Sequence, residues 1–292
     1  MVYKIMKGII LAGGAGTRLH PITKVVSKQL LPIYDQPMIY YPLSILINSG
    51  IDDIMIISTP EDKHLFQRLL GDGDQWGVKI SYSIQEKPQG IAQAFLISES
   101  WLNQSSCLLI LGDNLFFGPS INNLIKEAID KNTGATIFGY RVNDPNRFGV
   151  IEFDQNKNVI SLEEKPIKPK SDWIATGLYI YDAKAVERTK SLNFSKRNEL
   201  EITDLLKIYK NKNKLSYDFM GRGSAWLDTG SPKNLLSTSE FISTIEDRQG
   251  LKIGCIEEIA FNYNWINAKH IKQRIKYYGK SEYSNYLKNI IS

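Results

Sequence analysis

The sequence is poor in the residues that build covalent and metal frameworks. Its 292 residues include only two cysteines, Cys107 and Cys255, and three histidines, His20, His64 and His270. The cysteines form no CxxC pair and the histidines show no metal-ligand spacing, so we expect neither a disulfide framework nor a zinc module. Because Cys107 opens the apolar run CLLILG, its expected role is that of a small buried hydrophobe.

Long hydrophobic runs are missing as well. The longest apolar stretches, GIILAG and CLLILG, fall far short of the roughly 20 residues that a membrane span needs. The first of them leads into a glycine turn with no cleavage site behind it, which is not the pattern of a signal peptide. We therefore expect a cytoplasmic protein with no membrane partner.

What the chain does have is a globular composition with a small basic surplus. Hydrophobic residues make up 42% and charged residues 23%, which excludes collagen, coiled coils and disordered chains. The net charge of +5 suits nucleic acid, an acidic membrane surface or an anionic metabolite. The basic stretch 269–276 carries no recognised nucleic-acid motif, so we expect no nucleic-acid partner.

Strand-like and helix-like patterns alternate along the first half of the chain. Strands are expected over 7–12, 53–58, 78–84, 107–111 and 135–140, and helices over 37–48, 60–70, 92–102 and 120–131. This alternation predicts βαβ units. The expected fold class is therefore α/β, with a Rossmann-like, mostly parallel central sheet flanked by helices.

The second half of the chain changes in style. Its expected elements are a hairpin over 148–154 and 159–164, a strand over 174–181, and helices over 200–209, 231–245, 268–277 and 282–291. No linker rich in proline, glycine or serine divides the chain. We expect a single domain, 1–292, made of a core (5–145), a second part (146–245) and a helical C-terminal tail (246–292).

A glycine loop, GGAGTR, follows the first expected strand. Glycines allow positive φ and leave backbone N–H groups open to a phosphate. The loop matches neither the dinucleotide fingerprint, because Leu19 stands where the third glycine belongs, nor the Walker A pattern, because no GK[ST] follows. Arg18 and, ten residues later, Lys28 flank the loop and suit a polyphosphate. The alternative is a tight turn with surface charges.

These residues belong to a longer block, KGIILAGGAGTRLHPIT followed by SKQLLPIYDQPMIYYPLS, that closely resembles the signature of sugar-nucleotide pyrophosphorylases. The most specific resemblance is to the bacterial glucose-1-phosphate thymidylyltransferases. It recurs, in the family's order, in LLGDGDQWG, QEKPQGIAQAFLI, LGDNLFFG, DPNRFGVIEFD, SLEEKPIKPKS, ATGLYIYD, ELEITD, GRGSAWLDTG and CIEEIA. The resemblance implies the nucleotidyltransferase fold with sugar-binding insertions. It implies a nucleotide-binding core, a sugar-phosphate-binding second part and a regulatory tail.

The implied reaction is an in-line attack of glucose 1-phosphate on the α-phosphorus of dTTP. Its products are dTDP-glucose and pyrophosphate, and it is the first step of dTDP-rhamnose and deoxysugar synthesis. The resemblance assigns catalysis to Arg18, Lys28, Asp113 and Lys165. It assigns nucleotide binding to Leu11, Ala12, Gly13, Gly14, Gly16, Thr17, Arg18, Gln29, Gln85, Pro88 and Gly90. It assigns the sugar phosphate to Asn114, Gly149, Glu164, Lys165, Thr176, Tyr179 and Arg197, with Gly177 beside them.

Two aspartates are candidate Mg²⁺ ligands. Asp113 follows the run CLLILG, at the carboxyl end of an expected parallel strand, where open α/β sheets bind ligands. Asp228 lies in AWLDTG. Mg²⁺ prefers a few carboxylates together with phosphate oxygens. Taken alone, each aspartate is more typical of a helix cap or a turn, whereas the resemblance makes both of them metal ligands.

Nucleotide choice is open on chemistry alone. A glutamine amide at position 85 can donate and accept, and so matches the imide edge of thymine and of uracil alike. One methyl group is worth only about 1–3 kcal/mol. The alternatives are therefore a uridylyl- or adenylyltransferase, or a non-catalytic nucleotide-binding homologue; the missing third glycine argues against a Rossmann oxidoreductase.

The resemblance also implies feedback inhibition by dTDP-rhamnose at a second site between the subunits of a homotetramer. The matching positions are Gly118, Arg222, Glu258 and Ile259. The sequence departs from the family pattern at Phe148, a common tyrosine, at Pro119 after Gly118, and at Ile256, a frequent proline. The last two departures bear on effector affinity.

Overall fold

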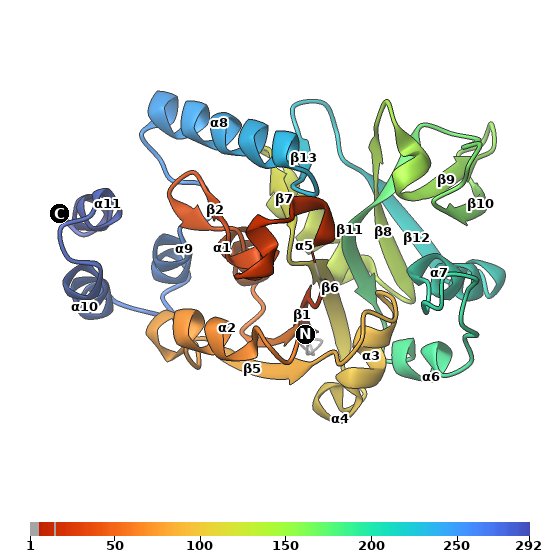
Figure 1. The fold of residues 1–292 in the computed structure, drawn as a ribbon, viewed down its shortest axis with the longest axis horizontal. Coiled ribbons are helices and arrows are strands. Elements are labelled where there is room, and N and C mark those ends of the chain that lie inside the picture. The colour runs from red at the N-terminus through yellow and green to blue at the C-terminus, as the bar shows by residue number, and fades with distance from the viewer. Residues whose placement is uncertain (1–5, 15) are drawn as a thin grey trace.

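The computed structural model describes residues 6–14 and 16–292. Residue 5, where the expected core begins, and Ala15 of the glycine loop lie outside the described residues. A nine-stranded sheet forms the centre of the molecule, and helices lie on both of its faces (Figure 1).

One half of the sheet is parallel, as the alternating pattern predicts. Its strands are β1 (Met6–Ala12), β4 (Asp53–Ser58), β5 (Lys79–Ile84) and β6 (Ser106–Leu111), in the order β6-β1-β4-β5. In this register Ile10 lies between Ile56 and Ile110. These strands are near-continuous apolar runs because helices cover both of their faces. Their carboxyl ends meet at one edge of the sheet, where the glycine loop begins.

The other half of the sheet is mostly antiparallel. Strand β11 (Trp173–Tyr181) joins the two halves by pairing with β6, β8 (Ala135–Arg141) and β9 (Gly149–Phe153). Strand β9 forms the expected hairpin with β10 (Val159–Glu164), and β12 (Leu215–Phe219) runs parallel to β8. The sheet is therefore mixed, with its parallel part beneath the glycine loop.

Two small sheets arise that the sequence pattern does not predict. One is the pair β2 (Pro32–Ile33) and β3 (Gln36–Pro37). The other pairs β7 (Asn114–Phe117) with β13 (Ala225–Asp228) and sets Asn114 opposite Asp228. Strands this short carry no readable alternation. The second pair is important because it brings two distant segments to the carboxyl end of β6.

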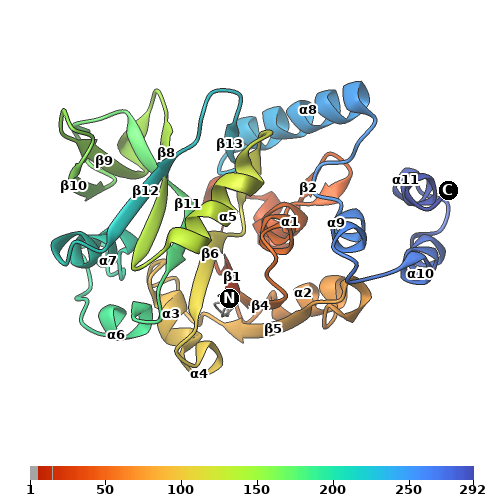
Figure 2. The same ribbon diagram turned by 180° about the vertical axis from the view of Figure 1, so that it is seen from behind.

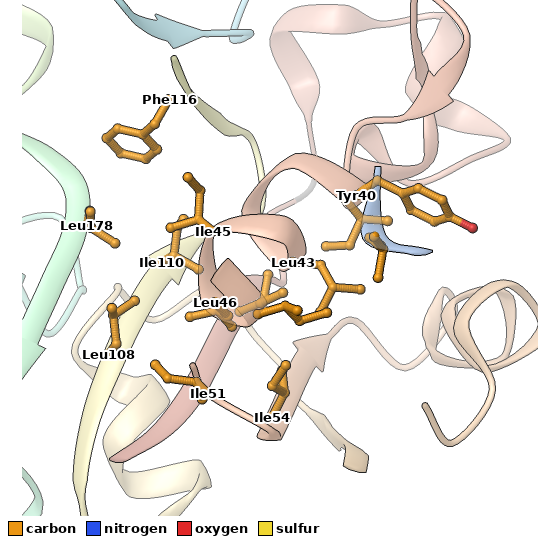
Figure 3. Packing of buried hydrophobic residues seen from close by; sticks show 14 of the residues in the cluster. Tyr40, Leu43, Ile45, Leu46, Ile51, Ile54, Leu108, Ile110, Phe116 and Leu178 are labelled. Carbon is orange, nitrogen blue, oxygen red and sulfur yellow. The ribbon is translucent and has the colours of Figure 1, made fainter. Parts of the chain in front are cut away.

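Alternate side chains of each central strand pack into different cores. Leu108 and Ile110 of β6 join the cluster beneath α1 (Tyr40–Asn48), α5 (Ile121–Lys131) and α9 (Ile256–Asn262), part of which Figure 3 shows. Cys107 and Leu109 face the opposite cluster, under helices α3 (Gln93–Ile97), α4 (Glu99–Leu102), α6 (Ala185–Thr189) and α7 (Ile202–Asn211). Cys107 is fully buried, which confirms its predicted role as a small hydrophobe. The helix predicted over 92–102 is in fact two helices that meet at Ser98.

The remaining helices lie at the periphery. They are α2 (Lys63–Leu70), α8 (Pro232–Gln249), α10 (Ala268–Tyr278) and α11 (Glu282–Ile290). Figures 1 and 2 show α10 and α11 as a pair at the C-terminal end of the molecule. The fully buried Glu257 of α9 fixes this pair, since it accepts hydrogen bonds from Trp76, Tyr278 and Tyr283 and pairs with Arg274 at 3.2 Å. Within the described residues, no helix is long and apolar enough to cross a bilayer.

Candidate active site

Two hollows adjoin at the carboxyl edge of the parallel strands. The first, which we call the Gln85 hollow, has a volume of about 220 Å³ and is lined by Leu11, Gly14, Gln29, Gln85, Pro88 and Gly90 among others. The second, the Asp228 hollow, has a volume of about 150 Å³ and is lined by Arg18, Asn114, Gly149, Tyr179 and Asp228 among others. Asp113, Glu164 and Lys165 line both. The two hollows therefore form one continuous site around these three charged residues.

The glycine loop forms one wall of the Gln85 hollow. A Cβ on Gly13 would collide with Oε1 of Gln85, so glycine is required there for Gln85 to lie over the loop. Gly14 is exposed and has nothing within 4 Å of a Cβ position, which leaves its backbone open to a ligand. Gly16 has a φ of +60°, in the left-handed region that favours glycine. Ala12, Gly13, Gly16 and Thr17 shape this loop but do not line the hollow.

Lys28 and Asp113 form an ion pair beside the site: Asp113 lines both hollows, whereas Lys28 lines neither and borders a neighbouring hollow that also includes Gly14. Nζ of Lys28 lies 2.5 Å from Oδ2 of Asp113, and Lys28 is only 5% exposed. Burial would raise the pKa of Asp113, but the adjacent ammonium and hydrogen bonds from Lys28 and Asn114 hold it below its usual range. Asp113 is therefore a carboxylate at neutral pH, with its charge directed into the site.

Asp228 lines the Asp228 hollow together with Asp113 and Lys165. Burial and the charge of Asp113 raise the pKa of Asp228, while Lys28, Arg18 and Arg147 oppose the rise. The two aspartates thus repel each other in a partly buried site, which is the electrostatic condition that a divalent cation relieves. In the described chain, no group of three or more His, Cys, Asp or Glu side chains gathers to form a metal site. The donor set fits a cation that takes its other ligands from phosphate oxygens.

Asn114 is engaged by its neighbours. Its Oδ1 accepts hydrogen bonds from Nε1 of Trp226 at 2.6 Å and from the backbone N–H of Gly177 at 3.1 Å. Its Nδ2 donates to Oδ1 of Asp113 at 2.8 Å. The resemblance assigns Asn114 to the sugar, but these bonds make it an orienting group for Asp113.

The pleat of β11 decides which of its residues face the site. Ala175, Gly177 and Tyr179 line the Asp228 hollow, whereas Thr176 lies on the other side of the strand and is fully buried. This alternation is a property of every strand. The side chain of Thr176, which the resemblance assigns to the sugar phosphate, is therefore not part of the site, and the backbone of Gly177 takes that position. A Cβ on Gly177 would lie 2.5 Å from Oδ1 of Asn114.

Arg197, the second cation assigned to the sugar phosphate, is held by carboxylates. Its guanidinium makes two hydrogen bonds to Glu201, at 3.0 and 2.7 Å, and one to Glu199, at 2.8 Å. A hydrogen bond from its side chain to Glu201 and the nearby carboxylates raise its pKa. It lies 3.8 Å from Oε1 of Glu164. Arg197 lines the Gln85 hollow. The carboxylates of Glu199 and Glu201 already compensate most of its positive charge.

Lys165 and Glu164 follow each other at the end of β10. Lys165 has a φ of +43°, a left-handed conformation that is uncommon for a residue with a side chain. Its Nζ lies 3.9 Å from Oε1 of Glu164, so the lysine is less strongly paired than Arg197. Burial raises the pKa of Glu164, and Lys165 and Arg197 lower it in part. The turn thus presents a weakly paired ammonium and a partly desolvated carboxyl side by side.

Two further residues of the site carry no assignment from the sequence. Arg147 lines the Asp228 hollow and lies 3.4 Å from Oδ2 of Asp228. Trp226 lines the same hollow and packs edge-on against Phe148, with 5.1 Å between the ring centroids. Both residues lie inside sequence blocks that resemble the family, DPNRFG and GRGSAWLDTG. Their position in these blocks was the only sequence feature that could have indicated that they belong to the site.

The four residues assigned to a second site lie outside both hollows. Gly118 directly follows β7, and a Cβ on it would meet Ser224, in the turn that also carries the exposed Arg222. Glu258 and Ile259 lie on α9, where Glu258 accepts a hydrogen bond from Tyr286 at 2.6 Å. The two pairs are therefore on separate elements of one chain.

Comparison with known proteins places the chain in a family. A model of the nucleotidyl transferase family matches residues 7–245. The chain is 53% identical to the glucose-1-phosphate thymidylyltransferase of Neisseria gonorrhoeae and 49% identical to that of Mycolicibacterium smegmatis, each over 98% of this chain and 99% of the relative.

Solved structures agree with this placement. A Bacillus anthracis protein assigned as a glucose-1-phosphate thymidylyltransferase, in complex with sucrose, superposes with a TM-score of 0.75 at 42% identity over 81% of this chain and 94% of that chain. A UDP-glucose pyrophosphorylase complexed with UDP-glucose shares the fold, with a TM-score of 0.74 at 22% identity over 82% of this chain and 99% of that chain. The chain belongs to the nucleotidyl transferase family, as its sequence blocks and its central sheet predict.

Proposed function

We propose that the chain transfers dTMP from dTTP to glucose 1-phosphate, with release of pyrophosphate. One observation carries the proposal beyond the family: two hollows adjoin at Asp113, Glu164 and Lys165. The Gln85 hollow would hold the nucleotide and the Asp228 hollow the sugar phosphate. The named activity of the relatives supports the same assignment.

The chemistry calls for cations and correct placement. The sugar phosphate is itself an anion that attacks the α-phosphorus, so no protein nucleophile is required. Arg18 and Lys28 would hold the triphosphate at the glycine loop, and Lys165 would hold the sugar phosphate. Bringing two anions together in this way, in a site with preorganised positive charge, is the main catalytic effect of such a site.

Nucleotidyltransferases of this kind generally use a divalent metal, and we propose Mg²⁺. Asp113 and Asp228 would hold it, because they are paired carboxylates whose mutual repulsion a cation relieves. Bound Mg²⁺ would supply Lewis-acid charge to the phosphate oxygens. Asn114 keeps Asp113 in its orientation, and Lys28 keeps Asp113 ionised.

The remaining features of the proposal concern regulation and assembly. We propose that the chain is divided into a nucleotide-binding core, a sugar-phosphate-binding part and a regulatory tail. We also propose that the protein forms a homotetramer in the cytoplasm and that dTDP-rhamnose inhibits it by feedback. Equilibrium binding of dTDP-rhamnose to protein whose catalytic site is blocked tests the regulation. A lack of binding, or binding that Arg222→Ala leaves unchanged, would remove the regulatory site from the proposal.

A substrate panel tests the catalytic proposal directly. Each nucleoside triphosphate is offered with glucose 1-phosphate, and pyrophosphate release is measured with Mg²⁺ and after chelation by EDTA. The expected result is turnover with dTTP that requires the metal. A strong preference for UTP or ATP would show that the chain is instead a uridylyl- or adenylyltransferase. Turnover in the presence of EDTA would contradict the proposed requirement for Mg²⁺.

A further inference from the structure

Three glutamine side chains form a hydrogen-bonded row at the edge of the Gln85 hollow. Nε2 of Gln93 donates to Oε1 of Gln89 at 2.8 Å. Nε2 of Gln85 donates in turn to Oε1 of Gln93 at 2.7 Å. Gln85 is 4% exposed and lines the hollow, while Gln93 lies on α3 behind it. The row therefore connects Gln85, which lines the hollow, to helix α3, which does not line it.

A backbone carbonyl fixes the direction of the row. Nε2 of Gln85 lies 3.2 Å from the carbonyl oxygen of Gly90. That oxygen can only accept a hydrogen bond, so the amide nitrogen of Gln85 must face it. A reversed amide would set two oxygens against each other. Gly90 itself cannot move freely, since it has a φ of +100° and its Cα packs directly against the backbone of Leu200.

Gln93 completes the restraint on Gln85. An amide nitrogen carries two hydrogens, and Gly90 and Gln93 take both of them. The group that Gln85 has left for a ligand is Oε1, which lies over Gly13 at the wall of the hollow. Gln85 is thus set as an acceptor, although a free glutamine can both donate and accept.

We propose that Gln93 is a positioning residue that holds Gln85 as a hydrogen-bond acceptor and thereby selects nucleotides whose base has a protonated ring nitrogen. This inference rests on the proposed function, in which the Gln85 hollow holds the base of dTTP. Thymine and uracil present a ring N–H between two carbonyl groups, whereas the corresponding nitrogen of cytosine carries no hydrogen and accepts. An oxygen fixed at Gln85 binds the first two and repels the third.

The energetic argument follows from burial. A polar group left without its partner in a buried site is strongly unfavourable, and a site built to bond one group discriminates strongly against a ligand that lacks it. Selection against cytosine is therefore assigned to the Gln93–Gln85 pair. Selection between dTTP and UTP is not, because both bases offer the same N–H.

The test compares Gln93→Met, Gln93→Glu and a matched control. Methionine keeps the length of the side chain but accepts no comparable hydrogen bond, so Gln85 loses its shorter hydrogen bond and only the longer one to the carbonyl of Gly90 still holds its amide. Glutamate keeps the acceptor for Gln85 and should restore the restraint. Gln67→Met, on the exposed face of α2, controls for exchanging a helical glutamine for methionine. The readouts are kcat and KM for dTTP, the ratio of kcat/KM for dTTP over CTP, KM for glucose 1-phosphate, and thermal unfolding.

Gln93→Met should raise KM for dTTP by about tenfold, lower the dTTP to CTP ratio by at least that factor, and leave kcat and KM for glucose 1-phosphate near those of the parent protein. Gln93→Glu should recover the ratio. The inference fails if Gln93→Met keeps the parental ratio, or if Gln93→Glu loses as much of it as Gln93→Met does. If the parent protein does not use dTTP at all, the proposed function fails instead, and the two failures are distinguished by the same assay.

Discussion

Trp226 donates its indole N–H to Oδ1 of Asn114 across a distance of 2.6 Å, and this bond determines what Asn114 does. The two residues are 112 positions apart in the chain and meet because β13 pairs with β7. With its oxygen engaged by Trp226 and Gly177, Asn114 can only present its nitrogen to Asp113. An indole on one strand thus orients a candidate metal ligand on another.

The first prediction follows from that bond. Trp226→Phe keeps an aromatic ring against Phe148 but removes the donor to Asn114. The loss of one such bond is worth about 1 kcal/mol, so we expect kcat to fall by about fivefold and the Mg²⁺ concentration at half-maximal rate to rise. Rates measured across an Mg²⁺ titration check this. An unchanged metal dependence, with thermal unfolding also unchanged, would contradict the orienting role.

The second prediction concerns the ion pair of Lys28 and Asp113. Asp113→Asn removes a candidate metal ligand and is expected to lower kcat by roughly 100-fold, the size seen when one electrostatic element of a site is lost. It also leaves the buried ammonium of Lys28 without its partner, so the unfolding free energy should fall by about 3–5 kcal/mol. Pyrophosphate-release rates and urea unfolding measure the two effects separately. A near-normal rate would mean that the metal is held elsewhere.

The third prediction concerns the carboxylates around Arg197. Glu199→Gln weakens one of its pairs while leaving the two hydrogen bonds to Glu201 in place. Because both side chains of the pair are about one-third exposed, the effect is small, up to about 1 kcal/mol. Arg197 and Glu199 both line the Gln85 hollow, which is assigned to the nucleotide. We therefore expect KM for dTTP to fall by up to about fivefold, as more positive charge becomes available to the triphosphate. Initial rates against dTTP measure it, and a raised KM would show that Glu199 assists binding.

The fourth prediction uses the raised pKa of Glu164. In the folded protein without substrate, burial raises the pKa of this carboxyl above its ordinary 4.5. The folded state then binds the proton more tightly than the unfolded state does, so the stability contributed by this group is present below pH 4.5 and is lost as the pH rises through the raised value. Glu164→Gln removes the titration. The variant should gain stability relative to the parent protein at neutral pH but not at pH 4.

Urea unfolding of both proteins between pH 4 and pH 7 measures this difference. Asp204→Asn, at a half-buried carboxyl on α7, serves as the control for exchanging a carboxyl for an amide. An equal stability difference at both ends of the range for Glu164→Gln would show that the carboxyl does not titrate abnormally.

The parallel half of the sheet and the glycine loop could be predicted from the amino-acid sequence. Strands such as β1 and β6 are continuous apolar runs because both of their faces are buried, and that pattern is local. The conformation of the glycine loop is local too, since positive φ at Gly16 and the open backbone at Gly14 depend on the absence of a side chain. The family blocks then placed Asp113, Lys165 and Asp228 in one site, and all three line the adjoining hollows.

The contacts of several of these residues could not be predicted from the sequence and follow from how the chain packs in three dimensions. The compensation of Arg197 by Glu199 and Glu201 depends on side-chain directions within a loop that no periodic pattern describes. Gly177 lines the site and Thr176 does not. This difference depends on which face of β11 is turned toward the site by its pairing with the neighbouring strands. The role of Asn114 depends on a partner more than 100 positions away. Spacing along a chain carries no information about such distant partners, because the pairing of strands and the packing of their side chains bring them together.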